Sequence, residues 1–256
     1  MASSALLMKS FTELLRASIS LARAFARHPT AAWTVVRVWR TGLSMLGLQA
    51  LLDLSEAVAW ADRERIPGII VEAGTAWGGS GLVLAASRRH KRPVYLYDTF
   101  EGIPPPTEAD GQQALRRFEE IRSGKASGVR RRAYYGYERN LLSRVRQSFA
   151  EYGMPVEDNQ IYLMPGLYQE TLYPPDQVAL AHLDCDWYES VKVCLERIVP
   201  RLAHGGRIII DDYDYWVGCK RAVDEYFADK QGEFQFVKRR RLHAIRRLDA
   251  DALPHH

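Results

Sequence analysis

The sequence contains few cysteines, lacks long apolar runs and carries no strong excess of one charge. Its three cysteines, Cys185, Cys194 and Cys219, include no closely spaced pair, which argues against a disulfide framework and favours reduced thiols in a cytoplasmic protein. No uncharged apolar run of about 18 residues occurs, so we expect no membrane-spanning helix. The net charge of +4 is concentrated near the two ends, which argues against nucleic acid as a partner.

The first 40 residues differ from the rest of the chain in charge. They contain six basic residues and a single acid, Glu13. Apolar residues recur in this region at the spacing of a helix, namely Leu7, Phe11, Leu14, Leu15 and Ile19. Such a helix could pack on the body of the protein or a second subunit, lie on a membrane surface, or belong to a transit-like peptide. We favour the packed helix.

Short apolar runs alternate with helical patterns along the 256 residues, 47% of which are hydrophobic. Helices are predicted at residues 43–66, 80–90, 138–152, 188–202 and 217–229. Strands buried on both faces are predicted at 69–71, 93–98, 161–164, 178–184 and 207–211. This alternation predicts a doubly wound, mostly parallel, Rossmann-like α/β sheet. Two further runs, 233–237 and 243–248, predict a C-terminal antiparallel hairpin and bring the sheet to seven strands. Residues 101–133, which contain three consecutive prolines, are interpreted as a long loop or lid.

Acidic residues follow four of the predicted strands. In a doubly wound sheet the ligand site lies beyond the carboxyl ends of the strands, so acids at these positions converge on one crevice. The residues concerned are Glu72, Asp98, Asp184, Asp186, Asp211 and Asp212.

The turn after the first predicted strand is rich in glycine and indicates a nucleoside cofactor. It reads EAGTAWGGSG from Glu72, without the GxGxxG spacing of dinucleotide binders. Glycines let the backbone approach a ligand closely, and Glu72 suits the ammonium group of a methionine moiety. Asp98, at the end of the second strand, can accept hydrogen bonds from ribose hydroxyls. The alternative is a tight turn beside a solvated aspartate.

The acids after the fourth and fifth strands predict a metal site. Side chains alternate along an extended strand, so Asp184 and Asp186 point to the same side. With Asp211 and Asp212 they form an all-oxygen cluster that suits Mg²⁺, Mn²⁺ or Ca²⁺. One of these acids could instead cap a helix. Cys185 is interpreted as a packing residue, since thiolates prefer softer metals, and His182 as a structural one.

Four stretches resemble the macrocin O-methyltransferase family of metal-dependent sugar O-methyltransferases. They read VEAGTAWGGSG, YLYDTFEGIPPPTEAD, LDCDWYES and GGRIIIDDYDYWVGCKRAVDEYF, and SMLGL at residues 44–48 supports them. The resemblance runs from about residue 40 to 230. The first 40 residues and the basic stretch 238–241 match no motif of the family.

The resemblance implies roles for individual residues. Asp184, Asp211 and Asp212 would bind Mg²⁺, and Asp186 would be the general base. Some members use a histidine from the central region, but no histidine lies between His90 and His182 here. The residues implied to surround S-adenosylmethionine are Glu72, Gly74, Thr75, Ser80, Asp98, Thr99 and Phe100.

The sequence therefore predicts an enzyme that transfers a methyl group from S-adenosylmethionine to a hydroxyl of a small acceptor. The expected acceptor carries neighbouring hydroxyls, as in a sugar or a sugar-bearing natural product. Residues 1–66 would form an N-terminal helical segment that shapes the site and a homo-oligomer, and residues 67–256 the methyltransferase domain. A metal-free O-methyltransferase and an NAD(P)-dependent oxidoreductase are the alternatives.

Overall fold

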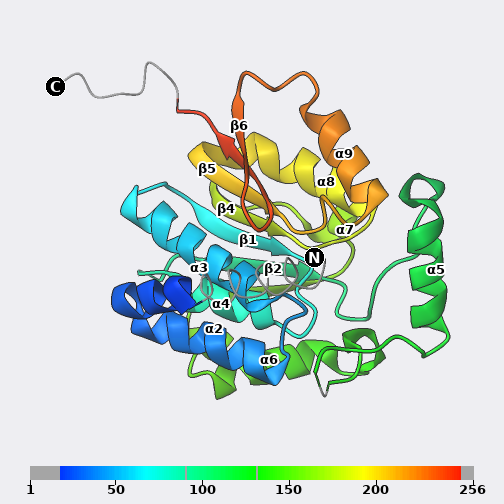
Figure 1. Ribbon diagram of the computed structural model, residues 1–256, viewed down its shortest axis with the longest axis horizontal. Helices are drawn as coiled ribbons and strands as arrows, with labels where there is room; N and C mark the ends of the chain where they lie inside the picture. The colour runs from blue at the N-terminus through cyan, green and yellow to red at the C-terminus, as the bar shows by residue number, and fades with distance from the viewer. Residues whose placement is uncertain (1–17, 90, 131, 249–256) are drawn as a thin grey trace, which may run out of the picture.

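A seven-stranded mixed sheet forms the centre of the molecule (Figure 1). The computed structural model describes residues 18–89, 91–130 and 132–248. The strand order is β3-β2-β1-β4-β5-β7-β6, in which β7 runs antiparallel to both of its neighbours. The strands are β1 Ile69–Ala73, β2 Val94–Asp98, β3 Ile161–Pro165, β4 Val178–Leu183, β5 Leu202–Ile210, β6 Phe234–Lys238 and β7 Leu242–Arg246. The predicted doubly wound sheet and its terminal hairpin are confirmed.

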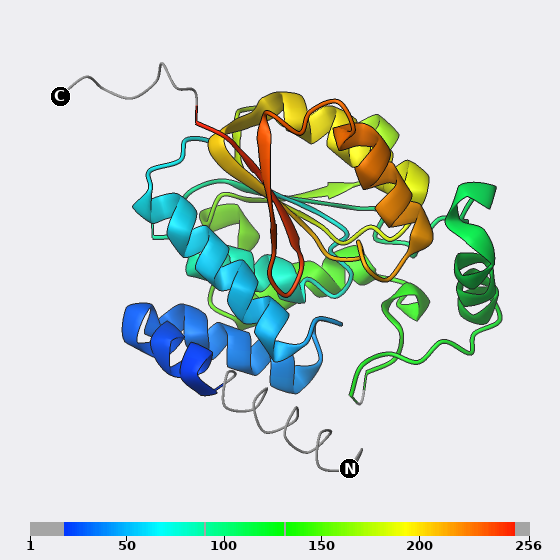
Figure 2. The same ribbon diagram turned by 45° about the horizontal axis from the view of Figure 1, so that its top comes forward.

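Helices cover both faces of the sheet, as Figures 1 and 2 show. Helices α8 and α9 pack on one face, and α2, α3, α4 and α6 pack on the other. The helices are α2 Pro29–Thr41, α3 Leu48–Arg63, α4 Gly79–Ser87, α5 Gly111–Arg122, α6 Leu141–Glu151, α7 Tyr168–Thr171, α8 Tyr188–Ile198 and α9 Val217–Phe227. The central strands β1 and β4 are buried along their whole length, which explains their unbroken apolar runs.

The N-terminal helices belong to the core of the molecule. Val35 and Val38 of α2 are fully buried in one apolar cluster with residues of α3, α4 and the sheet. Leu7, Phe11, Leu14 and Leu15, on which the prediction for the first 40 residues rests, lie outside the described residues. Within the described part of the chain, every helix is too short or too polar to cross a membrane.

The helix predicted at residues 43–66 begins later than expected. Gly42 adopts the left-handed conformation with φ 66° and ends α2, and α3 starts only at Leu48. Between the two helices, the Ser44 hydroxyl accepts a hydrogen bond from the Leu46 amide, which stabilises a bend in place of a helical turn. The prediction was wrong for residues 43–47.

The interpretation of residues 101–133 as one long loop was also wrong in part. A 3-10 turn, η1 Glu108–Asp110, leads into the three-turn helix α5. Helix α5 stands at one end of the molecule in both views and buries just two of its side chains, Ala114 and Ile121. Ion pairs such as Arg122 with Glu119 lie on its solvent side, and most of its residues are polar, so the helix is hard to recognise within a segment rich in prolines and glycines.

Candidate active site

A cavity of about 730 Å³ opens at the carboxyl ends of β1, β4 and β5. The strand order reverses between β1 and β4, and such a switch point is where doubly wound folds bind ligands. The glycine-rich turn after β1 and the acids after β4 and β5 line this cavity together. A second cavity of about 130 Å³ adjoins it and shares Gly74, Asp98 and Asp184. Five of the six acids predicted to converge on one crevice line this cavity, namely Asp98, Asp184, Asp186, Asp211 and Asp212, whereas Glu72 does not.

Three carboxylates form a tight cluster in the cavity wall. Asp184, Asp211 and Asp212 each offer one oxygen, and these oxygens lie within 4.8 Å of one another. The backbone holds them there, because the Asp184 amide donates to Ala73 O of β1 and the Asp211 amide to Leu183 O of β4. Both bonds measure 2.9 Å and extend the sheet ladder to the acids themselves.

The cluster carries unfavourable charge, which a bound cation would neutralise. Burial and the charges of neighbouring acids raise the pKa values of Asp184 and Asp212 well above their usual range. The buried Oδ2 of Asp212 has no hydrogen-bond partner among the described residues. An all-oxygen donor set with one unpartnered oxygen fits a hard divalent ion such as Mg²⁺, Mn²⁺ or Ca²⁺.

Asp186 faces both cavities from a strained turn just past the cluster. Its φ of 57° is left-handed, and the Trp187 amide bonds to Cys185 O at 2.7 Å across it. Burial raises the pKa of Asp186 to about 6, although a hydrogen bond from Trp216 opposes the rise. A carboxylate with this pKa can accept a proton near neutral pH.

Glu72 and His182 form a fully buried pair behind the cavity wall. The His182 Nδ1 lies 3.0 Å from Glu72 Oε1, and its Nε2 lies 4.0 Å from Asp211 Oδ1. Burial alone would lower the pKa of His182, but the carboxylates of Asp211 and Glu72 raise it to about 10. His182 therefore connects the first strand with the acid cluster. Glu72 is not part of the wall of either cavity, and its contact with the cofactor stays a prediction.

The glycine-rich turn is held close to the acid cluster. Gly74 has φ 93°, and a Cβ atom there would lie 1.8 Å from Asp184 O, so this position requires glycine. Thr75 and Ser80 line the larger cavity, and within the part of the chain that the structure describes the buried hydroxyl of Thr75 has no hydrogen-bond partner. The turn thus presents an unpaired hydroxyl and close-packed backbone beside the acids, which fits a polar cofactor.

Asp98 accepts hydrogen bonds from two backbone amides of this turn and from a third that follows β2. Its Oδ2 accepts from Thr75 N at 2.7 Å and Ala76 N at 3.0 Å, and its Oδ1 accepts from Phe100 N at 2.8 Å. The Thr99 hydroxyl also lies 3.5 Å from Oδ1, but it makes its shorter hydrogen bond, 2.6 Å, to Gly102 O. A carboxylate has about four acceptor positions, so one position is left for a ribose hydroxyl. Thr99 lines the smaller cavity, whereas Phe100 is buried with φ 54°. Their predicted contacts with the cofactor remain predictions.

Several cavity residues were missed by the sequence reasoning. They are Ser44, Met45, Leu46, Arg117, Tyr134, Tyr135, Trp216 and Arg241. The first three belong to the SMLGL stretch, whose match to the family was the one signal available. Arg117 lies on the unpredicted helix α5, and the remaining residues come from loops and from the hairpin turn.

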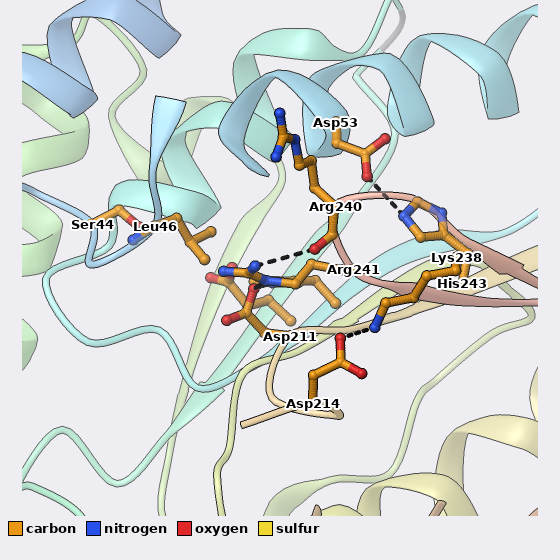
Figure 3. Close-up of polar contacts among 11 residues, drawn as sticks. Ser44, Leu46, Asp53, Asp211, Asp214, Lys238, Arg240, Arg241 and His243 are labelled. Carbon is orange, nitrogen blue, oxygen red and sulfur yellow. Dashed lines mark hydrogen bonds and ion pairs between the residues drawn. The ribbon is translucent and has the colours of Figure 1, made fainter. Parts of the chain in front are cut away.

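Arg241 brings the unexplained basic stretch 238–241 into the site. In Figure 3 its guanidinium lies beside Asp211, with which Nε forms a hydrogen bond and ion pair. Lys238 pairs with Asp214 (Figure 3), and Arg239 pairs with Asp53 of α3 at 2.9 Å. These contacts hold the β6–β7 turn from two sides. The His182 and Arg241 cations outweigh burial and lower the pKa of Asp211, so this acid is ionised within the cluster.

Solved structures with the same fold are methyltransferases. The O-methyltransferase NovP matches with a TM-score of 0.66 and 28% identity, over 80% of this chain and 82% of that one. CalS11, a calicheamicin methyltransferase, matches with a TM-score of 0.59 over 93% of both chains; at 19% identity it shows the fold alone. The fold and the site define an S-adenosylmethionine-dependent methyltransferase.

Sequence comparison gives the family. The macrocin O-methyltransferase (TylF) model matches residues 4–234. A tetracenomycin 4'-O-methyltransferase from Streptomyces olivaceus, which acts on the 8-demethyl-8-(2,3-dimethoxy-α-L-rhamnosyl) compound, is 35% identical over 189 residues, 72% of this chain and 67% of that protein. Demethyldecarbamoylnovobiocin O-methyltransferase from Streptomyces niveus is 31% identical over 191 residues, 72% of this chain and 68% of that protein. The chain belongs to the macrocin O-methyltransferase family and is an O-methyltransferase, which confirms the resemblance.

Proposed function

We propose that this enzyme methylates a hydroxyl of a sugar or sugar-bearing natural product with the help of a divalent metal ion. The observation that carries the proposal is the cluster of three carboxylate oxygens within 4.8 Å of one another, in one cavity with the glycine-rich turn and Asp186. The names of two relatives support the acceptor class, since one acts on a rhamnosyl tetracenomycin and one on a novobiocin precursor.

In this proposal one set of residues binds the methyl donor and a second set binds the metal ion. Gly74, Thr75 and Ser80 bind the methionine end of the methyl donor, and Asp98 and Thr99 bind its nucleoside end, with Glu72 and Phe100 supporting them from behind. Asp184, Asp211 and Asp212 would hold the metal ion. When bound, a divalent ion lowers the pKa of a coordinated hydroxyl and fixes the geometry of two neighbouring acceptor oxygens.

Asp186 is the general base in this proposal. Its carboxylate takes the proton of the acceptor hydroxyl, and the oxygen forms a bond to the methyl carbon as the carbon–sulfur bond breaks. The electron pair of that bond returns to sulfur, which leaves as the neutral thioether of S-adenosylhomocysteine. The proton passes from Asp186 to water when the product departs. Rate acceleration then rests mainly on holding donor and acceptor in line.

Metal removal tests the proposal against its metal-free alternative. We expect excess EDTA and the Asp184→Ala variant each to lower kcat at least 100-fold on a glycosylated acceptor, with recovery on adding Mg²⁺ for the chelated wild type only. Thermal shift with S-adenosylhomocysteine serves as the control, because cofactor binding at the glycine-rich turn should survive chelation. Full turnover in excess EDTA would establish the metal-free reaction. A thermal shift with NADH but not with S-adenosylhomocysteine would favour the oxidoreductase.

Three broader expectations remain part of the proposal. The N-terminal segment 1–66 is expected to shape the site and to contribute to a homo-oligomer, with the methyltransferase domain formed by residues 67–256. The free cysteines suit the reducing conditions of the cytoplasm. Light scattering on the purified protein measures the oligomeric state.

A further inference from the structure

Two tryptophans and a tyrosine stack beside Asp186. The ring centroids of Trp187 and Trp216 lie 5.1 Å apart at an interplanar angle of 65°, and those of Trp216 and Tyr215 lie 4.6 Å apart at 84°. Both tryptophans are buried, whereas Tyr215 is exposed at the opening of the cavity. Edge-to-face packing on both sides fixes the plane of the Trp216 indole.

The two indole N–H groups of the stack have different partners. Trp216 Nε1 donates to Asp186 Oδ1 at 2.6 Å, a short charge-assisted hydrogen bond. Trp187 Nε1 donates instead to the backbone oxygen of Pro104 at 2.8 Å. Among the described residues, Trp216 is the one side chain that hydrogen-bonds the Asp186 carboxylate. The molecule thus offers two similar donors, one directed at the base and one at a loop.

The backbone of Asp186 is strained. A non-glycine residue with φ 57° lies in the left-handed region, and such strain persists where surrounding contacts enforce it. Trp216 also belongs to the turn that carries the acid cluster, because its amide and that of Tyr215 both donate to Asp212 O. One turn after β5 therefore fixes Asp212 and, through the indole, Asp186.

We propose that Trp216 is a positioning residue for the methyl-transfer reaction: its indole N–H holds Oδ1 of Asp186 and leaves Oδ2 directed at the acceptor hydroxyl. This inference rests on the proposed function, in which Asp186 accepts the proton. A carboxylate held at one oxygen keeps its other oxygen aligned with the acceptor, and small displacements of a catalytic group are costly. Removing the indole N–H should slow the chemical step without weakening substrate binding.

A matched pair of variants tests the inference. Trp216→Phe and Trp187→Phe each keep an aromatic ring in the stack and each remove one indole N–H. We expect kcat to fall about 10- to 100-fold in Trp216→Phe, with the KM for acceptor and the Kd for S-adenosylhomocysteine within about threefold of wild type. The fold decrease in kcat for Trp187→Phe should be at least fivefold smaller than that for Trp216→Phe. Equal losses in the two variants would overturn the inference.

A double-mutant cycle with Asp186→Asn separates this inference from the proposed function. If Trp216 acts through Asp186, adding Trp216→Phe to Asp186→Asn should change kcat by less than twofold. A further loss as large as in the wild-type background would show a merely structural role and overturn the inference. An Asp186→Asn variant with wild-type kcat would instead refute the base itself, and with it the proposed chemistry.

A spectroscopic measurement covers the case in which Trp216→Phe does not fold. The short bond to a carboxylate should shift the indole N–H proton resonance of Trp216 downfield, and the resonance should move upfield in Asp186→Ala. The Trp187 resonance serves as the internal reference, because its partner is Pro104 O. An unchanged Trp216 resonance in Asp186→Ala would overturn the inference.

Discussion

Single residues determine how closely the two halves of the active site approach. Gly74 lies in the cofactor turn and touches the backbone of Asp184 at the acid cluster. Asp98 joins the same turn to β2 through two amide hydrogen bonds and accepts a third from Phe100, just past β2. The methyl donor and the metal ligands can therefore share one cavity because one position has no side chain and one carboxylate satisfies three backbone groups.

Gly74→Ala should damage both stability and activity. The added Cβ would lie 1.8 Å from Asp184 O, in a backbone conformation with φ 93° that disfavours alanine. We expect the free energy of unfolding to fall by about 3 kcal/mol and S-adenosylhomocysteine to lose most of its affinity. Urea unfolding and calorimetry measure the two effects.

Gly153→Ala is the control for this substitution. Gly153 also has a left-handed φ, 73°, but a Cβ atom added there would have no other atom within 4 Å among the described residues. In Gly153→Ala we expect the free energy of unfolding to fall by about 1 kcal/mol, because of backbone strain, and the affinity for S-adenosylhomocysteine to stay unchanged. Equal losses in the two variants would show that backbone strain, and not contact with Asp184, sets the cost.

Whole elements meet at the β6–β7 hairpin, which closes the sheet edge next to the site. Asp53 of α3 accepts from His243 Nε2 of β7 and from Arg239 of the turn, both at 2.9 Å. This buried network connects an N-terminal helix to the C-terminal hairpin. Arg241, two residues after Arg239, is thereby placed against Asp211.

Asp53→Asn should destabilise the protein in a pH-dependent way. Burial raises the pKa of Asp53, but the hydrogen bonds and charges of His243 and Arg239 outweigh it and lower the pKa below 3.8. A depressed folded-state pKa contributes stability above pH 3.8 that is lost as the pH falls through the folded-state value. We expect the free energy of unfolding of Asp53→Asn to be lower than that of the wild type by about 1–3 kcal/mol at pH 7, and this difference to shrink below pH 3.8.

Melting temperatures of wild type and Asp53→Asn between pH 3 and 8 measure this difference. Glu56→Gln is the matched control, since Glu56 lies 3.5 Å from the same Arg239 but its side chain is 53% exposed. Exposed ion pairs contribute little to stability, so the melting temperature of Glu56→Gln should stay close to that of the wild type. If the melting temperature of Asp53→Asn were lower than that of the wild type by the same amount at every pH, the charge of Asp53 would not be the source of the stabilisation.

At the scale of the whole molecule, the sequence predicted the sheet well because the central strands are buried on both faces. Runs such as residues 69–71 are apolar for that reason, and the acids that end them could be assigned to one crevice. Three predicted metal ligands do meet within 4.8 Å. These predictions were possible because buried strands have apolar sequences and because the carboxyl ends of parallel strands lie at the same edge of a sheet.

The remaining features depend on contacts between distant segments, which local patterns do not encode. Helix α5 is amphipathic but mostly polar, and it lies in a stretch whose prolines and glycines indicate a loop. Trp216 reaches Asp186 across 30 positions, and Arg241 reaches Asp211 across the same separation. Glu72, which is predicted to bind the cofactor because it precedes the glycines, also contacts His182, a residue far along the chain that no local pattern connects to it.

Direct metal binding tests the central claim most sharply. We expect electron paramagnetic resonance to detect one Mn²⁺ bound per chain in the presence of S-adenosylhomocysteine, displaced by Mg²⁺ and lost in Asp184→Ala and Asp212→Ala. Asp62→Ala, which removes a buried acid paired with Arg92 at 2.9 Å outside the cavity, should leave binding intact. The absence of saturable Mn²⁺ binding to the wild-type protein, or equal binding to Asp184→Ala, would contradict the account.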